Sequence, residues 1–137
     1  MKIELDTDVR RLLLEQITTY EQLETLLLLH AQPAQGWSAP AVAAAVRIQE
    51  DSAAAALNEL VAQRLVSFKS DGDKSEYQYA AADAAAASAV DRLSQAYSQQ
   101  RLEVVKQMSA NAIERVRSSA ARTFSDAFIF RRKKDDR

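Results

Sequence analysis

The sequence predicts a mainly α-helical fold with one small β-hairpin, and three observations carry this prediction. The 137 residues include only two glycines and two prolines, and alanine is abundant, as in the near-continuous run at positions 80–87. Such a composition favours helices over long flexible loops. Apolar residues recur at spacings of three and four through most of the chain. Around the dipeptide Asp71-Gly72 the spacing changes towards two, as expected for a hairpin.

Two amphipathic helices are expected before the central region. Their apolar faces consist of Val9, Leu12, Leu13 and Ile17 in residues 7–17, and of Tyr20, Leu23, Leu26 and Leu27 in residues 20–31. The pairs Thr18 with Glu21 and Thr19 with Gln22 both fit the capping-box pattern, which places the start of the second helix there. The proline and glycine of the following loop end this helix. Trp37 is expected to pack on the core beside that loop.

Residues 38–80 predict a helix, a turn, a second helix and a hairpin. Ser38 can cap the first helix through its side-chain oxygen, and Asp51 or Ser52 would cap the second. The apolar face of the second helix consists of Ala53, Ala56, Leu57 and Leu60. The alternating strand residues are Val66 and Phe68 before the turn and Tyr77 and Tyr79 after it. This order is that of a winged helix-turn-helix, with flanking N- and C-terminal helices.

The run IQEDSAAAALNELVAQRLV resembles the recognition-helix signature of bacterial winged-helix regulators of the MarR, PadR and ArsR kind. In those proteins a small-residue helix with a buried Ala-Leu pair leads into a Leu-Val entry to the wing. Here the positions are filled by Ala56-Leu57, Leu60 and Leu65-Val66. The resemblance covers about half of the chain and implies a DNA-binding transcriptional regulator. The ending also resembles small winged-helix proteins that finish in an F-x-D-A-F motif followed by basic residues.

The exposed face of the predicted recognition helix departs from the family pattern. Such helices usually present polar or basic side chains that reach base edges and phosphates, whereas this one presents Ala54 and Ala55 where a Ser-Arg pair is common. Residues 32–82 contain four basic and six acidic residues, a net charge of −2, although a dimer could still gather Arg47, Lys69 and Lys74 on one surface. Because phosphate contacts supply most non-specific affinity, a second interpretation stays open: a protein-interaction module that docks a partner through the alanine-lined face.

Residues 83–108 are expected to form one long helix. Its apolar stripe consists of Val90, Leu93, Tyr97, Val104 and Met108. At about 37 Å such a helix is longer than a small winged helix can cover with its own core, so we expect a homodimer through the terminal helices. The chain is interpreted as a single domain of residues 1–137. It comprises an N-terminal helix (1–19), a winged-helix core (20–82), a long C-terminal helix (83–110) and an aromatic, basic, irregular tail (111–137).

The C-terminal half is the electropositive part of the chain. Residues 83–137 contain eleven basic and seven acidic residues, a net charge of +4. A cluster of four cations, Arg131, Arg132, Lys133 and Lys134, follows the phenylalanines at positions 124, 128 and 130. The cluster could bind phosphate, anionic lipid or an acidic protein surface, or serve as a solubilising tail. The phenylalanines could pack on this protein's own helices, on a dimer mate or in a partner's groove.

If DNA is the partner, the sequence predicts three groups of contacts. The recognition helix would supply Gln49, Ser52, Asn58 and Gln63. The wing would supply Lys69 and Lys74, and the cluster Arg131, Arg132, Lys133 and Lys134 would contact the DNA backbone.

The residue inventory argues against most other classes of protein. The absence of cysteine excludes disulfides, thiolate metal sites and cysteine nucleophiles. His30 is the only histidine and is expected to be structural, and no catalytic grouping, phosphate-binding loop or metal-ligand spacing is present. We therefore expect a protein without catalytic activity or cofactor.

No apolar run approaches the roughly 20 residues that span a bilayer, and the acidic start MKIELDTD is unlike a signal peptide. A cytoplasmic location without membrane contact is expected.

Overall fold

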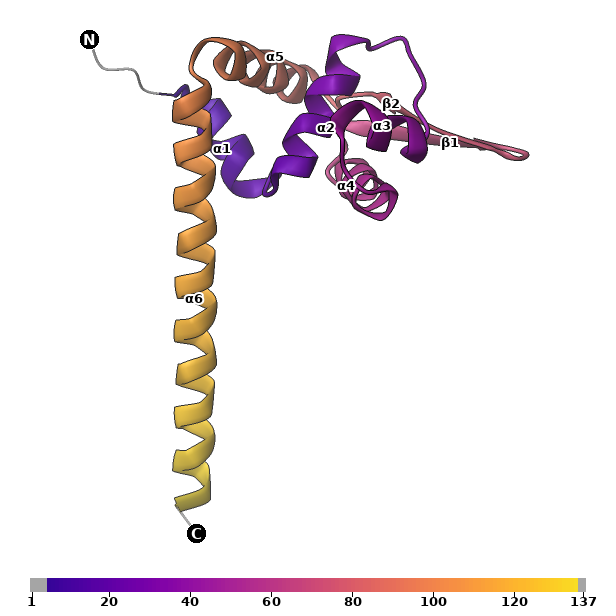
Figure 1. The fold of residues 1–137 in the computed structure, drawn as a ribbon. Coiled ribbons are helices and arrows are strands. Elements are labelled where there is room, and N and C mark those ends of the chain that lie inside the picture. The colour runs from indigo at the N-terminus through magenta and orange to yellow at the C-terminus, as the bar shows by residue number, and fades with distance from the viewer. Residues whose placement is uncertain (1–4, 136–137) are drawn as a thin grey trace.

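The computed structural model describes the backbone of residues 5–135 and the side chains of residues 5–124. Within this part of the chain six helices and two strands follow one another (Figure 1). They are α1 (Thr7–Glu15), α2 (Tyr20–Ala31), α3 (Ala39–Val46), α4 (Glu50–Ala62), β1 (Val66–Asp71), β2 (Lys74–Tyr79), α5 (Ala84–Gln99) and α6 (Arg101–Asp135). The predicted class, a mainly helical winged helix-turn-helix with a small hairpin and flanking helices, is confirmed.

The winged-helix core forms where α2, α3 and α4 pack against one another. Leu23 of α2, Val42 of α3 and Leu57 of α4 are all fully buried, because each helix carries its apolar residues on the face that meets the other two. The alanines on the buried side of α4, Ala53 and Ala56, allow close approach of the neighbouring helices. The predicted apolar face of α4 is therefore its packed face.

Helix capping follows the sequence at two of three places. Thr19 accepts a hydrogen bond from the backbone N–H of Gln22 at 3.1 Å, while the Gln22 side chain accepts one from the N–H of Thr18 at 2.8 Å. Ser38 caps α3 by accepting from the N–H of Ala41 at 3.2 Å. The predicted cap of the next helix was wrong: α4 already begins at Glu50, and its cap residue Gln49 makes no side-chain cap bond.

A left-handed residue explains this early start. Arg47 ends α3 with a φ of 65°, and its N–H still bonds to the carbonyl oxygen of Ala43. A residue in the left-handed conformation ends a helix and changes the direction of the chain. Helix α4 therefore begins at Glu50, before Asp51 and Ser52.

The hairpin is antiparallel, and its turn lies one residue later than predicted. Asp71 pairs with Lys74 across the ladder, so the two-residue turn is Gly72-Asp73 rather than Asp71-Gly72. Gly72 has a φ of 62°, a conformation that glycine adopts without steric cost. At its base the hairpin is held by Trp37, which exchanges two backbone hydrogen bonds of 2.7 Å with Tyr77.

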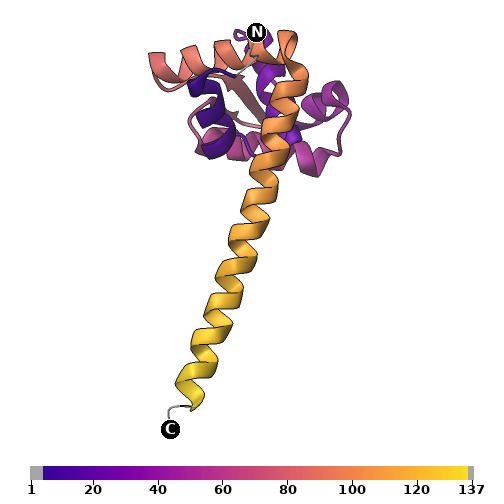
Figure 2. The same cartoon turned by 90° about the vertical axis from the view of Figure 1, so that its left-hand side faces the viewer.

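The predicted long helix over residues 83–108 is two helices that meet at Gln100. Val90 and Leu93 of α5 and Val104 and Met108 of α6 all belong to one buried core. Both helices pack on α1. A single straight helix over residues 83–108 would be too long for both of its halves to contact the nine residues of α1. The chain therefore turns at Gln100, so that α5 crosses the top of the molecule and α6 descends beside α1 (Figures 1 and 2).

Helix α6 continues to Asp135, so the prediction of an irregular tail was wrong for residues 111–135; residues 136 and 137 lie outside the described residues. Its first half packs on α1 and α5, and the remainder projects from the body as a single rod (Figure 2). Arg115 joins α6 to α1 by donating to the carbonyl oxygens of Leu14 at 3.0 Å and Leu13 at 3.5 Å. These are last-turn carbonyls, which a cation stabilises.

Candidate nucleic-acid interface

The exposed N-terminal end of α4 carries two of the predicted DNA contacts. In helix-turn-helix proteins the first residues of the second helix contact base edges. Gln49 lies at this end with an exposed side chain, and Ser52 is half-buried one turn further on. Two exposed carboxylates, Glu50 and Asp51, occupy the same turn. The structure therefore brings two of the predicted contact residues together, beside two negative charges.

The other two predicted residues of α4 lie elsewhere. Asn58 accepts a hydrogen bond of 2.9 Å from the hydroxyl of Tyr77, so its amide oxygen ties α4 to the wing. Gln63 is the residue that ends α4, and its amide donates to Glu59 at 3.1 Å. It lies about 21 Å along the helix from Gln49. A DNA duplex contacted at the N-terminal end of α4 is therefore far from Gln63.

The two wing lysines lie directly across the ladder from carboxylates. Lys69 is paired with Glu76 and Lys74 with Asp71, and all four side chains are exposed. Opposite charges at paired positions attract one another. The lysines remain accessible to phosphate, but the neighbouring carboxylates weaken the positive field of the wing.

Arg47 is a further candidate contact, which the sequence placed with Lys69 and Lys74 on one possible surface of a dimer but not among the predicted DNA contacts. Its side chain is exposed in the short turn between α3 and α4, two residues before Gln49. In the sequence, Arg47 could have been found by its position directly after the first helix of the predicted helix-turn-helix. The remaining predicted contacts, Arg131, Arg132, Lys133 and Lys134, lie on the far part of α6, and their side chains are outside the described residues.

The Asn58–Tyr77 hydrogen bond can be tested against a matched tyrosine. We expect Tyr77→Phe to lower the free energy of unfolding by about 1 kcal/mol, because the change leaves the Asn58 oxygen without this donor. Tyr79→Phe is the control, since the buried hydroxyl of Tyr79 has no hydrogen-bond partner. Urea denaturation of both variants makes the comparison. Equal stability losses would contradict a role for the Tyr77 hydroxyl in joining α4 to the wing.

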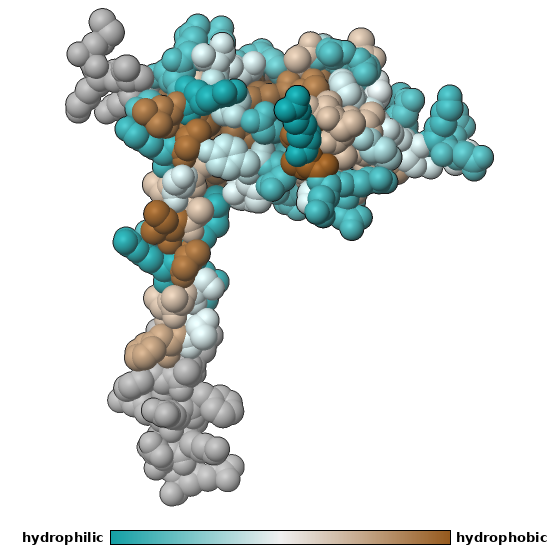
Figure 3. Space-filling view, viewed as in Figure 1, coloured by the Kyte–Doolittle hydropathy of each residue, from teal (hydrophilic) through white to brown (hydrophobic). Residues whose placement is uncertain are grey.

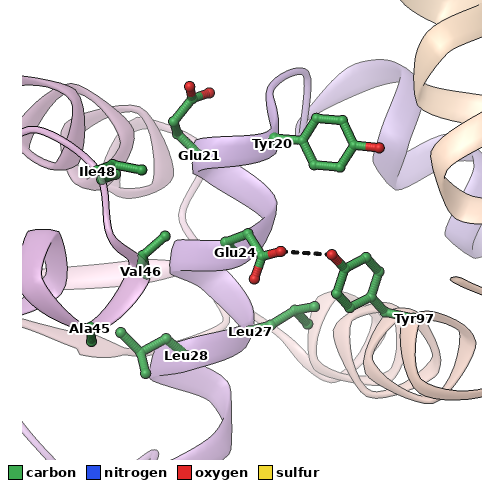
Figure 4. Close-up of a pocket in the computed structure, with 9 residues that line it drawn as sticks. All are labelled: Tyr20, Glu21, Glu24, Leu27, Leu28, Ala45, Val46, Ile48 and Tyr97. Carbon is green, nitrogen blue, oxygen red and sulfur yellow. Dashed lines mark hydrogen bonds between the residues drawn. The ribbon is translucent and has the colours of Figure 1, made fainter.

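A pocket of about 500 Å³ lies between α2, the turn after α3 and the C-terminal end of α5 (Figure 4). On its α5 side the Tyr97 hydroxyl donates to Glu24 at 2.6 Å, and the Arg101 guanidinium lies 4.4 Å from the centre of the Tyr97 ring. Burial, followed by the hydrogen bond to Glu24, raises the pKa of Tyr97 to about 12. These contacts fix the corner between α5 and α6 to α2 of the winged-helix core.

The titration of Tyr97 is a second test of the structure. In the unfolded chain a tyrosine ionises near its model value of 10.0, whereas Tyr97 in the folded protein keeps its proton to about pH 12. The stabilisation from this group is therefore complete below pH 10 and is lost as the pH rises from 10 to 12. Ultraviolet absorbance should show a late-ionising tyrosine that is absent in Tyr97→Phe. If the difference between the two titration curves showed a tyrosine that ionises near pH 10, the burial of Tyr97 and its contact with Glu24 would be contradicted.

Two other kinds of site are absent from the described residues. No group of three or more histidine, aspartate or glutamate side chains among them could hold a metal ion. None of the helices described is long and apolar enough to cross a membrane. His30 contacts Asp91 at 2.7 Å and the edge of the Tyr79 ring, so it joins α2, α5 and the wing.

No protein-family model matches the chain, and no curated protein matches it in sequence. Solved structures match it in fold. MepR, a transcription regulator of the Staphylococcus aureus multidrug efflux pump MepA, superposes with a TM-score of 0.50 at 16% identity, over 88% of this chain and 90% of that one. The MarR-family transcription regulator SP03579 superposes with a TM-score of 0.50 at 19% identity, over 87% and 80%. MepR in a DNA complex gives 0.52 at 19% identity, over 81% and 88%.

The fold is a MarR-like winged helix. At such low identity the likeness establishes the arrangement of helices and wing and no more. In this arrangement α3 and α4 form the helix-turn-helix and the β1–β2 hairpin is the wing. The resemblance of the C-terminal motif to that of small winged-helix proteins stays a prediction from the sequence.

Proposed function

We propose that the protein is a non-catalytic, DNA-binding transcriptional regulator of the winged-helix type that acts as a homodimer. The observation that carries this proposal is the free N-terminal end of α4, which exposes Gln49 next to Arg47 in the turn before it. Helix-turn-helix proteins read bases with this part of the second helix. A MarR-like fold, shared with a regulator that has been solved in a DNA complex, supports the same assignment.

The proposed contacts divide into reading and positioning groups. Gln49 and Ser52 would meet base edges, because the structure places them at the free end of α4. Lys69 and Lys74 of the wing, together with Arg47, would contact phosphates. The amide oxygen of Asn58 accepts from the Tyr77 hydroxyl, so its amide N–H groups would be the ones that donate to a base. The cluster at 131–134 stays a proposed backbone contact.

A second candidate function is docking of a protein partner on α4, and one feature favours it. A groove of about 340 Å³ runs between the start of α2 and the outer face of α4. Its lining includes Ala55, Ser52 and Glu59 of α4 and Glu21 of α2. Small side chains and carboxylates suit the close approach of a basic protein surface better than that of phosphate.

Binding to labelled DNA fragments over a range of salt concentrations tests the proposed function. DNA recognition predicts sequence-selective binding that weakens linearly on a log–log plot as salt rises. Lys69→Ala and Lys74→Ala should each weaken binding to all sequences. Because each substitution removes one phosphate contact from both protomers of the dimer, it should lower the salt slope by about two. Absence of binding at low salt would contradict the proposal. A protein partner would instead be sensitive to Ala54→Trp or Ala55→Trp, which add volume to a face that tolerates close approach.

A further inference from the structure

The outward face of α4 carries Asn58 in line with the start of the helix. Asp51, Ala55 and Asn58 are spaced by four and three positions, so they lie within about 60° of one another around the helix. All three are exposed, whereas Leu60, about 180° from Asp51, is fully buried. The region of α4 and the tip of the wing are mainly hydrophilic in Figure 3. Because Ala55 is small, a groove of DNA can come close to this face, and the short Asn58 side chain can reach it.

The wing fixes the direction of the Asn58 amide. The hydroxyl of Tyr77 on β2 donates a hydrogen bond of 2.9 Å to the Asn58 side-chain oxygen. Tyr77 is only 8% exposed, its backbone exchanges two hydrogen bonds of 2.7 Å with Trp37, and its ring lies 4.9 Å from that of Phe68. Tyr77 is therefore a fixed donor. The amide N–H groups of Asn58 take no part in this hydrogen bond, and they belong to an exposed side chain.

We propose that Tyr77 is a positioning residue for base recognition, which turns the N–H groups of Asn58 towards the DNA so that Asn58 selects guanine or thymine. This inference rests on the proposed function and specifies one base of its DNA site. In the major groove guanine presents the acceptors N7 and O6, and thymine presents the acceptor O4. Each of these atoms can accept from an amide N–H group. Tyr77 acts through Asn58 and needs no contact with DNA of its own.

The Tyr77 hydrogen bond works against the usual partner of asparagine. An asparagine reads adenine by donating to N7 while its oxygen accepts from the N6 amino group, which requires the oxygen and the nitrogen to face the base together. The oxygen of Asn58 is turned to Tyr77 instead. The amino group of adenine, or that of cytosine, would then face the N–H groups of Asn58. Two donors that face each other leave both unpaired, so we expect selection of about tenfold for guanine or thymine.

Selection from a pool of randomised DNA duplexes tests this inference with the full-length protein. The duplexes bound at low salt should share one position in each half-site at which guanine or thymine is enriched over adenine and cytosine. Asn58→Ala should lose this preference and keep those at other positions, which identifies the base that Asn58 contacts. Tyr77→Phe keeps the ring and removes the hydroxyl, so the amide can turn and adenine should rise at the same position by about tenfold. Tyr79→Phe is the matched control and should keep the original preference, because the Tyr79 hydroxyl has no hydrogen-bond partner in the described part of the chain.

A change in base preference separates positioning from stability. A loss of stability in Tyr77→Phe would lower the fraction of folded protein and weaken binding to every duplex in proportion. It would leave the ratios between duplexes unchanged. Thermal unfolding followed by circular dichroism sets a temperature for the binding measurements at which every variant is folded.

The outcomes separate this inference from the proposed function. If adenine or cytosine is enriched at the position whose preference is lost in Asn58→Ala, the inference is wrong. It is also wrong if no position changes in Asn58→Ala, or if Tyr77→Phe keeps the original preference. In each of these cases sequence-selective binding remains, and the proposed function stands. If no duplex is enriched and none binds at low salt, the proposed function is overturned and the inference with it.

Discussion

Leu57→Ala is expected to lower the free energy of unfolding by about 2–5 kcal/mol, the largest effect of any single change considered. Leu57 is fully buried on α4, where α4 meets α2 and α3. Truncation removes buried apolar surface and leaves a cavity that the surrounding helices fill only in part. Since small domains are stable by only about 5–15 kcal/mol, the loss is a large share of the total. Urea denaturation at one fixed protein concentration measures it.

The matched control is Leu14→Ala, the same chemical change at a residue that is 53% exposed on α1. We expect this variant to lie within about 0.5 kcal/mol of the unmodified protein. DNA binding by Leu57→Ala should fail together with folding as temperature rises. If the two leucine variants were equally stable, the packing of α4 on α2 and α3 would be wrong.

Removing the two carboxylates at the start of α4 is expected to have the largest effect on DNA binding. Glu50 and Asp51 lie in the first turn of the helix, beside Gln49. If phosphates approach this end, the double variant Glu50→Gln with Asp51→Asn should raise affinity by about tenfold or more at low salt, because it removes like-charge repulsion from each protomer. The increase should shrink at high salt. Binding to non-specific fragments should rise in the same way.

A control of equal charge separates local from overall electrostatics. Glu15→Gln with Glu114→Gln makes the same change in net charge on exposed residues of α1 and α6. We expect it to alter DNA affinity far less. An equal gain from both double variants would mean that net charge alone controls binding. No gain from the α4 variant would place the phosphates elsewhere and favour a protein partner for this face.

The features that the sequence predicted correctly are those fixed by local chemistry. Thr19 and Ser38 cap their helices because a side-chain oxygen needs only the N–H groups of the next turn. The buried face of α4 follows from the spacing of its apolar residues. The hairpin follows from alternation on both sides of a turn that contains Gly72. Each of these depends on residues within a few positions of one another.

The features that the sequence missed depend on contacts between distant segments. Gln100 is neither proline nor glycine, and the helix breaks there because α5 and α6 both bury apolar residues against α1. The one-residue difference in the hairpin turn sets Lys74 against Asp71, which changes the electrostatics of the wing. Asn58 is held by Tyr77, a residue 19 positions away.

The sequence by itself therefore determined the order of elements from α1 to β2, the caps of α2 and α3, and the winged-helix class, because propensity, capping and periodicity act over a few residues. Only the tertiary structure decided which face of α6 stays uncovered and which side chains at α4 are free to meet a partner. Those properties depend on where distant helices pack, and packing is settled by the fit of whole apolar faces rather than by any local pattern.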